Sequence, residues 1–246
     1  MEHNDMIFGI RALLEAVDAG KEIDKILVKK DLQGELAQEL FAAIKGLDIP
    51  VQRVPIEKLN RITRKNHQGV IAFISPVAYQ HIDNIVPSLY EVGKVPFIVL
   101  LDGLTDVRNF GAIARTCECA GVDAIVIPER GSVSVTADAV KTSAGALLHI
   151  PVCRERSIAD TLQYLQECGI KIVAASEKAS VAYTAEDYTT PIAIVMGAED
   201  VGISPQAMRL CEAQVALPQK GRIGSLNVSV AAGVMIYEVL RQRSAE

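Results

Sequence analysis

The chain contains no tryptophan, and aromatic residues make up only 4% of its 246 residues. Aliphatic side chains and alanine must therefore fill the interior, and 50% hydrophobic residues are enough for a buried core. No apolar run approaches the roughly 20 residues that span a bilayer. The segment Met1 to Asp5 also lacks the basic and apolar regions of a signal peptide. The sequence therefore predicts a folded cytoplasmic protein.

Cysteine is scarce and has no pairing pattern. The five cysteines are odd in number and include no Cys-x-x-Cys pair, which argues against a disulfide framework or a zinc site. The four histidines are scattered without the spacing of metal ligands. We therefore expect buried, reduced cysteines and no bound metal.

Positive charge is not in excess, since the net charge is −5, and this argues against a broadly basic nucleic-acid-binding protein. The distribution changes that view, because residues 1–80 carry 11 Lys or Arg and 11 Asp or Glu, so the whole acidic excess lies beyond them. Within this neutral part, residues 58–69 hold four cations, a histidine and two asparagines, and no acid. A local patch is sufficient for phosphate binding. An ordinary solvated helix end would have the same composition.

Residues 1–75 alternate helical and strand patterns. A helical stripe over Gly9 to Ala19 and a second one from Leu36 to Leu47 are separated by the short β-branched segment Ile23 to Val28. Pro50 to Val54 and Val70 to Ile74 also read as strands. This pattern predicts a small α/β domain, followed by a semi-ordered linker at residues 76–95, where proline and glycine recur.

From residue 96 the alternation becomes regular, which predicts a second domain over residues 96–246. Apolar strands are expected at Phe97 to Leu101, Ala124 to Ile127, Ile170 to Ala175, Ile192 to Met196 and Gln214 to Leu217, with helices between them. Strands separated by helices imply a parallel sheet covered on both faces. There is no Gly-x-Gly-x-x-Gly fingerprint and no P-loop, so a nucleotide-binding metabolic enzyme of that kind is disfavoured.

Three separated segments carry residues suited to chemistry. They run from Asn109 to Cys117, from Ile194 to Ser204 and from Leu217 to Gly233. In the third segment, a strand leads into a loop with two glycines and two cations, and a helix of small residues follows. Glycine lets such a loop approach a small ligand closely, and Asn227 or Ser225 can cap the helix. By itself the pattern is also compatible with an ordinary connection between a strand and a helix.

Together, and in this order, the three segments resemble the three signatures of the SpoU (TrmH-like) branch of the SPOUT RNA methyltransferases. The resemblance implies a C-terminal SPOUT domain with a deep trefoil knot and a small N-terminal α/β/α RNA-binding domain. The knot would otherwise be rejected, since true knots are rare. The two-domain arrangement and the segment from His67 to Val70 look most like bacterial 23S rRNA guanosine 2′-O-methyltransferases. The implied cofactor is S-adenosylmethionine, the implied partner is RNA, and the implied assembly is a homodimer.

The resemblance also implies a set of site residues. Arg115 matches an arginine that acts at the ribose 2′-hydroxyl, and because a guanidinium is a poor base we expect it to hold phosphate and stabilise the developing alkoxide. Glu199 would orient Arg115 or the target nucleotide, or form a structural ion pair. The implied catalytic residues are Asn109, Arg115, Glu199, Ser225 and Asn227, and the cofactor-binding residues are Gly197, Leu217, Ser225 and Leu226. The RNA-binding residues are Arg61, Arg64, Lys65 and His67, and weaker candidates are Asp200, Gln219 and Arg222.

Two other functions remain open at this stage. A tRNA 2′-O-methyltransferase of the same family is one, although those enzymes often lack such an N-terminal domain. A non-catalytic RNA-binding or ribosome assembly factor with this fold is the other, although it would be expected to lose some of the site residues.

Overall fold

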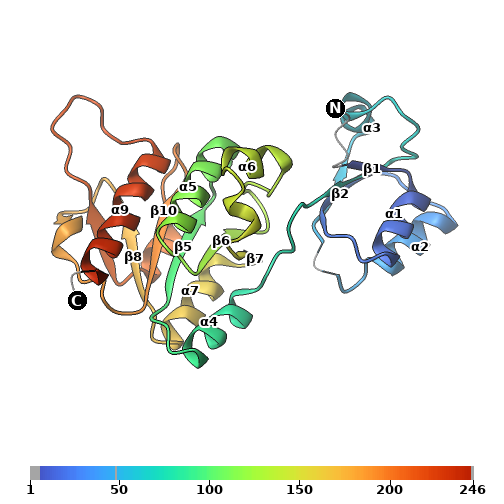
Figure 1. Ribbon diagram of the computed structural model, residues 1–246. Coiled ribbons are helices and arrows are strands. Elements are labelled where there is room, and N and C mark those ends of the chain that lie inside the picture. Colours follow the sequence, from blue (N-terminus) through green and yellow to red (C-terminus); the bar gives the residue numbers. More distant parts are fainter. Residues whose placement is uncertain (1–5, 48, 245–246) are drawn as a thin grey trace. The chain divides into compact units, whose positions relative to one another are not determined.

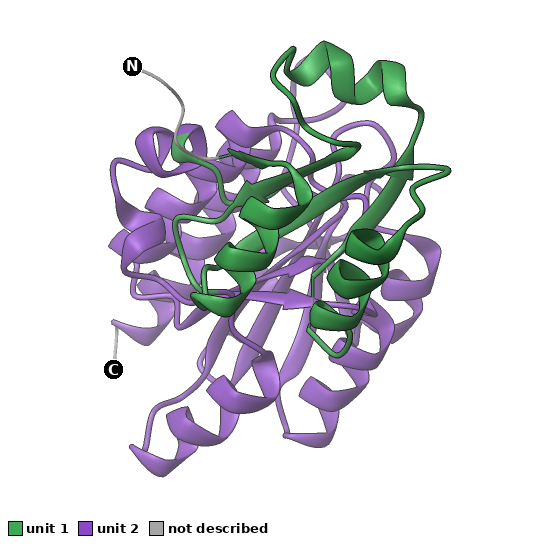
Figure 2. Ribbon diagram, turned by 90° about the vertical axis from the view of Figure 1, so that its right-hand side faces the viewer, with its two compact units in different colours: residues 1–78, 134–137 green, residues 79–133, 138–246 purple. Residues whose placement is uncertain are grey.

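The computed structural model describes residues 6–47 and 49–244, which form two compact units. Of the described residues, those up to 78 and residues 134–137 form one unit, and residues 79–133 and those from 138 onward form the other. Figure 1 shows the elements in chain order, and Figure 2 shows the two units in separate colours. Each unit has its own β-sheet and its own hydrophobic core.

The smaller unit is built on a four-stranded sheet in the order β1-β4-β2-β3. Strands β1 and β2 pair antiparallel with β4, and β2 pairs parallel with β3. The strand β1 lay outside the sequence prediction because three residues are too few to establish an alternation. The strands are β1 (Met6–Phe8), β2 (Ile23–Lys29), β3 (Val51–Val54) and β4 (Val70–Ile74).

Helices cover both faces of this sheet. Helices α1 (Ile10–Asp18) and α2 (Glu35–Ala43) pack on the face that includes Ile26 and Val28. Helix α3 (Ile56–Ile62) packs on the opposite face, where Leu59 is fully buried among residues that include Leu27 and Ile71. Successive strand residues point to opposite faces, so β2 supplies both cores and the unit has the predicted α/β/α arrangement.

The larger unit contains a seven-stranded sheet in the order β7-β6-β5-β10-β8-β11-β9, and every pair in it is parallel. The predicted parallel sheet is therefore confirmed. The short strands β7 and β9 were not predicted, since neither has a distinctive apolar run. The strands are β5 (Phe97–Asp102), β6 (Ala124–Pro128), β7 (Val152–Glu155), β8 (Lys171–Ala175), β9 (Val181–Ala182), β10 (Ile192–Gly197) and β11 (Ala213–Ala216).

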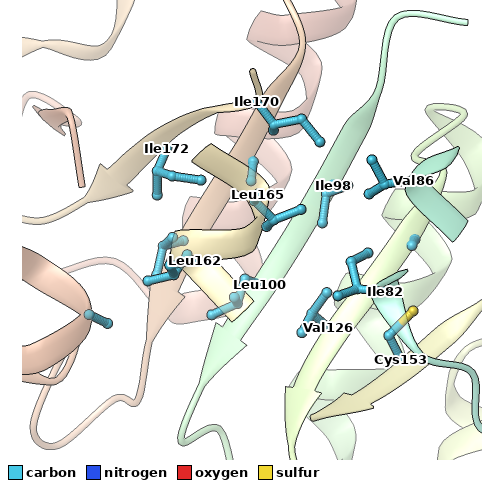
Figure 3. Packing of buried hydrophobic residues seen from close by; sticks show 14 of the residues in the cluster. Ile82, Val86, Ile98, Leu100, Val126, Cys153, Leu162, Leu165, Ile170 and Ile172 are labelled. Atoms are coloured by element: carbon cyan, nitrogen blue, oxygen red, sulfur yellow. The ribbon is translucent and has the colours of Figure 1, made fainter. Parts of the chain in front are cut away.

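Helices also cover both faces of the larger sheet. On one face, α4 (Ile82–Glu91), α7 (Ile158–Glu167) and α8 (Pro205–Leu210) pack against strand residues such as Ile98 and Leu100 (Figure 3). The other face carries α5 (Val107–Cys119) and α9 (Val228–Arg243), which pack against each other, with α9 also on β10. Between β6 and β7 lie α6 (Ala137–Thr142) and the short helix η1 (Ala146–Leu148), and η2 (Tyr183–Ala185) follows β9.

The region predicted as a semi-ordered linker, residues 76–95, contains the helix α4. Three of its side chains, Ile82, Val86 and Leu89, are buried, and the first two belong to the core of the larger unit. The prediction of a semi-ordered linker rested on the recurrence of proline and glycine, whereas Pro87 lies inside the helix. The apolar positions 82, 85, 86 and 89 nevertheless follow helical spacing.

The five cysteines are free, and Cys117 and Cys153 are fully buried. Burial raises the pKa of both thiols, so they behave as small apolar side chains. Across residues 6–47 and 49–244, no helix is long and apolar enough to cross a membrane. The trefoil knot stays a prediction from the resemblance.

Candidate functional site

The site forms where strand β10 ends at Gly197. A β-carbon on Gly197 would lie only 2.2 Å from the backbone carbon of Gly202 and the backbone nitrogen of Ile203. The loop after β10 folds back this closely because Ala198 and Gly202 exchange backbone hydrogen bonds of 3.2 and 2.9 Å. Gly202 has a φ of 70°, which glycine adopts without strain. The absence of a side chain at Gly197 thus makes room for the backbone of residues 202 and 203.

Three polar side chains from different segments meet beside this loop. The Asn109 amide nitrogen (Nδ2) donates to Glu199 Oε1 at 2.7 Å. The Asn227 amide nitrogen donates to the same carboxylate oxygen at 3.0 Å and to Asn109 Oδ1 at 3.1 Å. We call Asn109, Glu199 and Asn227 the amide–carboxylate cluster. The structure therefore brings together one residue from each of the three sequence segments.

Helix ends position the two asparagines. Asp106 caps α5, and its Oδ1 accepts from the backbone N–H of Asn109 at 2.8 Å, which places Asn109 in the first helical turn. Asn227 is the N-cap of α9, and its Oδ1 accepts from the backbone N–H of Ser229 at 3.0 Å. The cap uses the oxygen of Asn227 and leaves its nitrogen for the cluster, so one side chain begins the helix and completes the site.

A cavity of about 280 Å³ lies next to the cluster. It sits at the carboxyl ends of β8, β10 and β11, the edge at which sites form in open parallel sheets. Its lining includes Glu199 and Asn227 of the cluster. It also includes all four residues predicted to bind the cofactor, namely Gly197, Leu217, Ser225 and Leu226.

Arg115 is not part of this lining. It lies on α5 six residues after Asn109, about 600° around the helix, so the two residues face different directions. The side chain is exposed and has no hydrogen bond or ion pair with the residues that the structure describes. The Glu199 carboxylate is bonded to two amides and not to Arg115, so the predicted orienting contact between them is absent from the described structure.

The sequence did not identify the segment that follows β8 as part of the site. Ala175, Ser176, Glu177 and Lys178 all line the cavity. The predicted strand Ile170 to Ala175 gave the available signal, because the carboxyl ends of neighbouring parallel strands share one edge of the sheet. Of the weaker candidates, Gln219 lines the cavity, whereas the exposed Asp200 and Arg222 do not.

The predicted RNA-binding residues lie in the smaller unit, at the end of α3 and just after it. Arg61 is in the last turn of α3, and Arg61, Arg64 and Lys65 are all exposed. The Lys65 ammonium lies 5.3 Å from the centre of the Phe8 ring, a cation–π distance. These three cations thus form a local positive surface, which we call the α3 cationic surface.

His67 differs from these cations because it is only 7% exposed. Its Nδ1 accepts from the backbone N–H of Gly69 at 3.0 Å, so the ring proton resides on Nε2, which lies 2.9 Å from Asn60 Oδ1. Both ring nitrogens are therefore used inside the protein. His67 stabilises the turn before β4, and the RNA contact predicted for it is not supported by this geometry.

No group of three or more His, Cys, Asp or Glu side chains in the described part of the chain could hold a metal ion. The polar side chains among the described lining residues are two carboxylates, two amides, two hydroxyls and one ammonium group.

Comparison with known families gives two matches. Residues 96–237 match the model of the SpoU rRNA Methylase family. Residues 6–80 match the model described as RNA 2'-O ribose methyltransferase substrate binding.

Two bacterial relatives match nearly end to end. A protein of Staphylococcus saprophyticus, named as a TrmH family tRNA/rRNA methyltransferase, is 37% identical over 97% of this chain and 96% of its own length. A protein of Bacillus subtilis with the same family name is 34% identical over 99% of this chain and 98% of its own length.

The chain is also similar to solved structures of RNA methyltransferases. An AdoMet-bound rRNA methyltransferase from Sinorhizobium meliloti is 26% identical, with a TM-score of 0.61, over 96% of this chain and 87% of that one. The SpoU methyltransferase AviRb from Streptomyces viridochromogenes shares the fold, with 23% identity and a TM-score of 0.63 over 98% of this chain and 91% of that one. The tRNA-modifying TrmH/SpoU enzyme of A. aeolicus is 29% identical, with a TM-score of 0.57, and covers 67% of this chain and 85% of its own.

Proposed function

Because this chain belongs to the SpoU rRNA methylase family, we propose that it methylates a ribose 2′-hydroxyl of RNA with S-adenosylmethionine as the donor. The proposed target is a guanosine of 23S rRNA. The observation that carries the proposal is the amide–carboxylate cluster beside the cavity, since it joins the three family-like segments in one site.

The cavity suits S-adenosylmethionine in its chemistry. Buried apolar side chains, among them Met196 and Val215, can pack on the adenine, and the nearby Glu199 carboxylate favours a positively charged sulfur. Backbone groups of Gly197, Leu217 and Leu226 would hold the adenine and ribose, and Ser225 would bind polar atoms of the donor. When bound, S-adenosylmethionine supplies a methyl group on a sulfonium, so the donor is already activated for transfer.

The protein's own residues then have distinct roles. The amide–carboxylate cluster is held by hydrogen bonds before the substrate arrives, so it can position the target ribose without further reorganisation. Arg115 would hold a substrate phosphate and stabilise the negative charge that develops on the attacking 2′-oxygen. A guanidinium does not release its proton in proteins, so we assign the uptake of the 2′-hydroxyl proton to a neighbouring substrate phosphate.

RNA recognition is assigned to the smaller unit. We propose residues 1–75 as the RNA-binding domain and the α3 cationic surface as its phosphate contact, since the exposed Arg61, Arg64 and Lys65 provide local positive charge in an acidic chain. Residues 96–246, together with α4, are proposed as the catalytic domain. The rRNA target is supported by coverage, because the structure described as an rRNA methyltransferase matches 96% of this chain and the tRNA-modifying enzyme matches 67%.

We further propose a cytoplasmic homodimer. On α9, Val230 and Tyr237 are 52% and 51% exposed. They are seven residues apart and so share one helix face. Covering these apolar groups with a second copy would remove them from water. Sedimentation analysis at micromolar protein should give a dimer, and a monomer at that concentration would contradict this part of the proposal.

The direct test is transfer of a tritiated methyl group from S-adenosylmethionine to protein-free 23S rRNA, 16S rRNA or bulk tRNA. Label in 23S rRNA is expected, and Arg115→Ala should reduce the rate of labelling by about a hundredfold, the lower end of the effect of removing a transition-state contact. Glu118→Ala, an exposed position on the same helix, is the matched control and should keep the wild-type rate.

The other outcomes separate the remaining functions. Label in tRNA alone would make the protein a tRNA 2′-O-methyltransferase. Cofactor binding without transfer to any RNA, including ribosomal subunits as a particle substrate, would favour a non-catalytic RNA-binding factor.

A further inference from the structure

We propose that the loop after β8 binds the amino-acid end of the methyl donor, with the Lys178 ammonium on its α-carboxylate and the Glu177 carboxylate on its α-ammonium. This inference rests on the proposed function and assigns residues that neither the motifs nor the fold comparison identifies. The chemical class recognised is an α-amino acid attached to a nucleoside through sulfur.

The polarity of the cavity divides into two regions. Met196, Ile203 and Val215 are at most 9% exposed and give an apolar interior. Glu177 and Lys178 are exposed, so they lie at the solvent side of the lining. A ligand with an aromatic base at one end and a zwitterion at the other matches this division, because the apolar base is buried and the charged end stays near water.

The charged side chains that line the cavity also favour the loop after β8 as the site for the amino-acid end of the donor. Among the described lining residues, Lys178 is the only cation, and Glu177 and Glu199 are the only carboxylates. Glu199 already accepts two amide hydrogen bonds in the amide–carboxylate cluster. Glu177 and Lys178 form no ion pair with each other or with other described residues. One carboxylate and one ammonium therefore remain available to an incoming zwitterion.

The backbone holds this loop in place. The backbone N–H of Ser176 donates to Val215 of β11 at 2.9 Å, which ties the start of the loop to the neighbouring strand. The Ser176 hydroxyl accepts from the backbone N–H of Lys178 at 3.3 Å, and the backbone N–H of Ala179 donates to Ser176 at 3.1 Å. These bonds fix where the two charged side chains begin, which lowers the entropy lost when they bind a ligand.

The experiment compares two ligands that share the nucleoside and the sulfur, of which only one carries the amino-acid end that this loop is proposed to bind. S-adenosylhomocysteine carries the α-carboxylate and α-ammonium, whereas 5′-methylthioadenosine keeps the nucleoside and sulfur and lacks both groups. Their affinities for the full-length protein are measured by titration calorimetry. The variants are Lys178→Ala, Lys178→Arg and Glu177→Gln, and Lys141→Ala, an exposed lysine outside the cavity lining, is the control.

For Lys178→Ala and Glu177→Gln, the affinity for S-adenosylhomocysteine should fall about fivefold, as expected for a solvent-exposed charge pair. The affinity for 5′-methylthioadenosine should stay within about twofold, because that ligand has no charge to lose, and Lys178→Arg should restore most of the lost affinity. The control should bind both ligands like the wild type.

Several results would overturn the inference. An equal loss for both ligands would show that the loop shapes the nucleoside site, for example through the ribose hydroxyls. An unchanged affinity for S-adenosylhomocysteine, with or without weaker RNA binding in Lys178→Ala, would remove the assignment while the proposed function stands. Wild-type protein that binds neither ligand would contradict the proposed cofactor itself, and the subsite with it.

Discussion

Among the glycines of the chain, Gly197 is the one at which an added β-carbon would lie nearest to other atoms, 2.2 Å from the backbone of residues 202 and 203. The loop that would have to move also lines the cavity. We expect Gly197→Ala to weaken S-adenosylhomocysteine binding by about fivefold or more, since overpacking a well-packed position costs about 1–3 kcal/mol. Gly221→Ala is the control, because no atom lies within 4 Å of the added carbon. Wild-type binding by Gly197→Ala would show that the loop adapts freely.

Variants of Asn227 can show whether the amide–carboxylate cluster affects the rate of methyl transfer independently of the cap of helix α9. Asn227→Asp keeps the oxygen that caps α9 but replaces the nitrogen that donates to Glu199 with a second carboxylate oxygen. Like charges at this separation repel, so methyl transfer at pH 8 should fall at least about tenfold. Asn227→Ser keeps a capping oxygen without the extra charge and should give an intermediate rate. Methyl transfer by Asn227→Asp at the wild-type rate would exclude a role for the amide donor.

Within one short segment, we expect His67 to contribute to stability and Arg64 to contribute to RNA binding. His67→Ala removes the acceptor for Gly69 N–H and the partner of Asn60, so the free energy of unfolding should fall by about 1–3 kcal/mol. Arg64→Ala, at an exposed position, should leave the free energy of unfolding unchanged and should weaken RNA binding. The slope of log K for RNA binding against log salt concentration should fall by about one. Urea unfolding and RNA titration at several salt concentrations measure both. Loss of RNA affinity in His67→Ala without loss of stability would restore His67 as an RNA contact.

At the scale of elements, α4 shows that the segment after the smaller unit is part of a core. Val86 is 1% exposed and belongs to the cluster shown in Figure 3. Val86→Ala should therefore lower the free energy of unfolding of the larger unit by about 1–3 kcal/mol, from lost burial and a small cavity. Val92, 71% exposed at the end of the same helix, is the matched control, and Val92→Ala should change stability by less than about 0.5 kcal/mol. Equal small effects would indicate that α4 detaches readily.

Elements with strong local signals are the ones that sequence rules identify. The start of α8 at Ser204 and Pro205 has the capping serine and the proline at the first helical position that sequence rules require. The central strands β5, β8 and β10 were predicted to within one residue at each end, because strands buried on both faces are continuous apolar runs. Strand β9, with two exposed residues, has no such run, and it pairs because β11 lies beside it.

At the scale of the whole molecule, we expect the larger unit to bind the methyl donor and the smaller unit to bind RNA. Every residue that lines the cavity belongs to the larger unit. A fragment of residues 79–246 should bind S-adenosylhomocysteine within about twofold of the full chain, and RNA methylation by the fragment should fall at least about tenfold because the α3 cationic surface is gone. Full RNA methylation by the fragment would show that the larger unit recognises RNA unaided.

The sequence by itself determined the composition of the core, the parallel sheet and the three segments that supply the site. These features depend on local hydrophobic periodicity, on capping residues and on residue identity, all of which are present in the unfolded chain. The resemblance of the three segments to the SpoU signatures is what named Gly197, Glu199, Leu217, Ser225, Leu226 and Asn227 before any coordinates, and the structure places all six around one cavity.

Only the tertiary structure decided how those residues interact. The hydrogen bonds of Asn109 and Asn227 with Glu199 join positions 90 and 28 residues apart, and the order of strands that brings them together leaves no local trace in the sequence. The same holds for the loop of Glu177 and Lys178, which lines the cavity because β8 lies between β10 and β11. His67 illustrates the reverse case, since a histidine among cations looks like a ligand until burial and two hydrogen bonds assign it to the turn. Local patterns specify elements, and long-range packing decides which side chains meet.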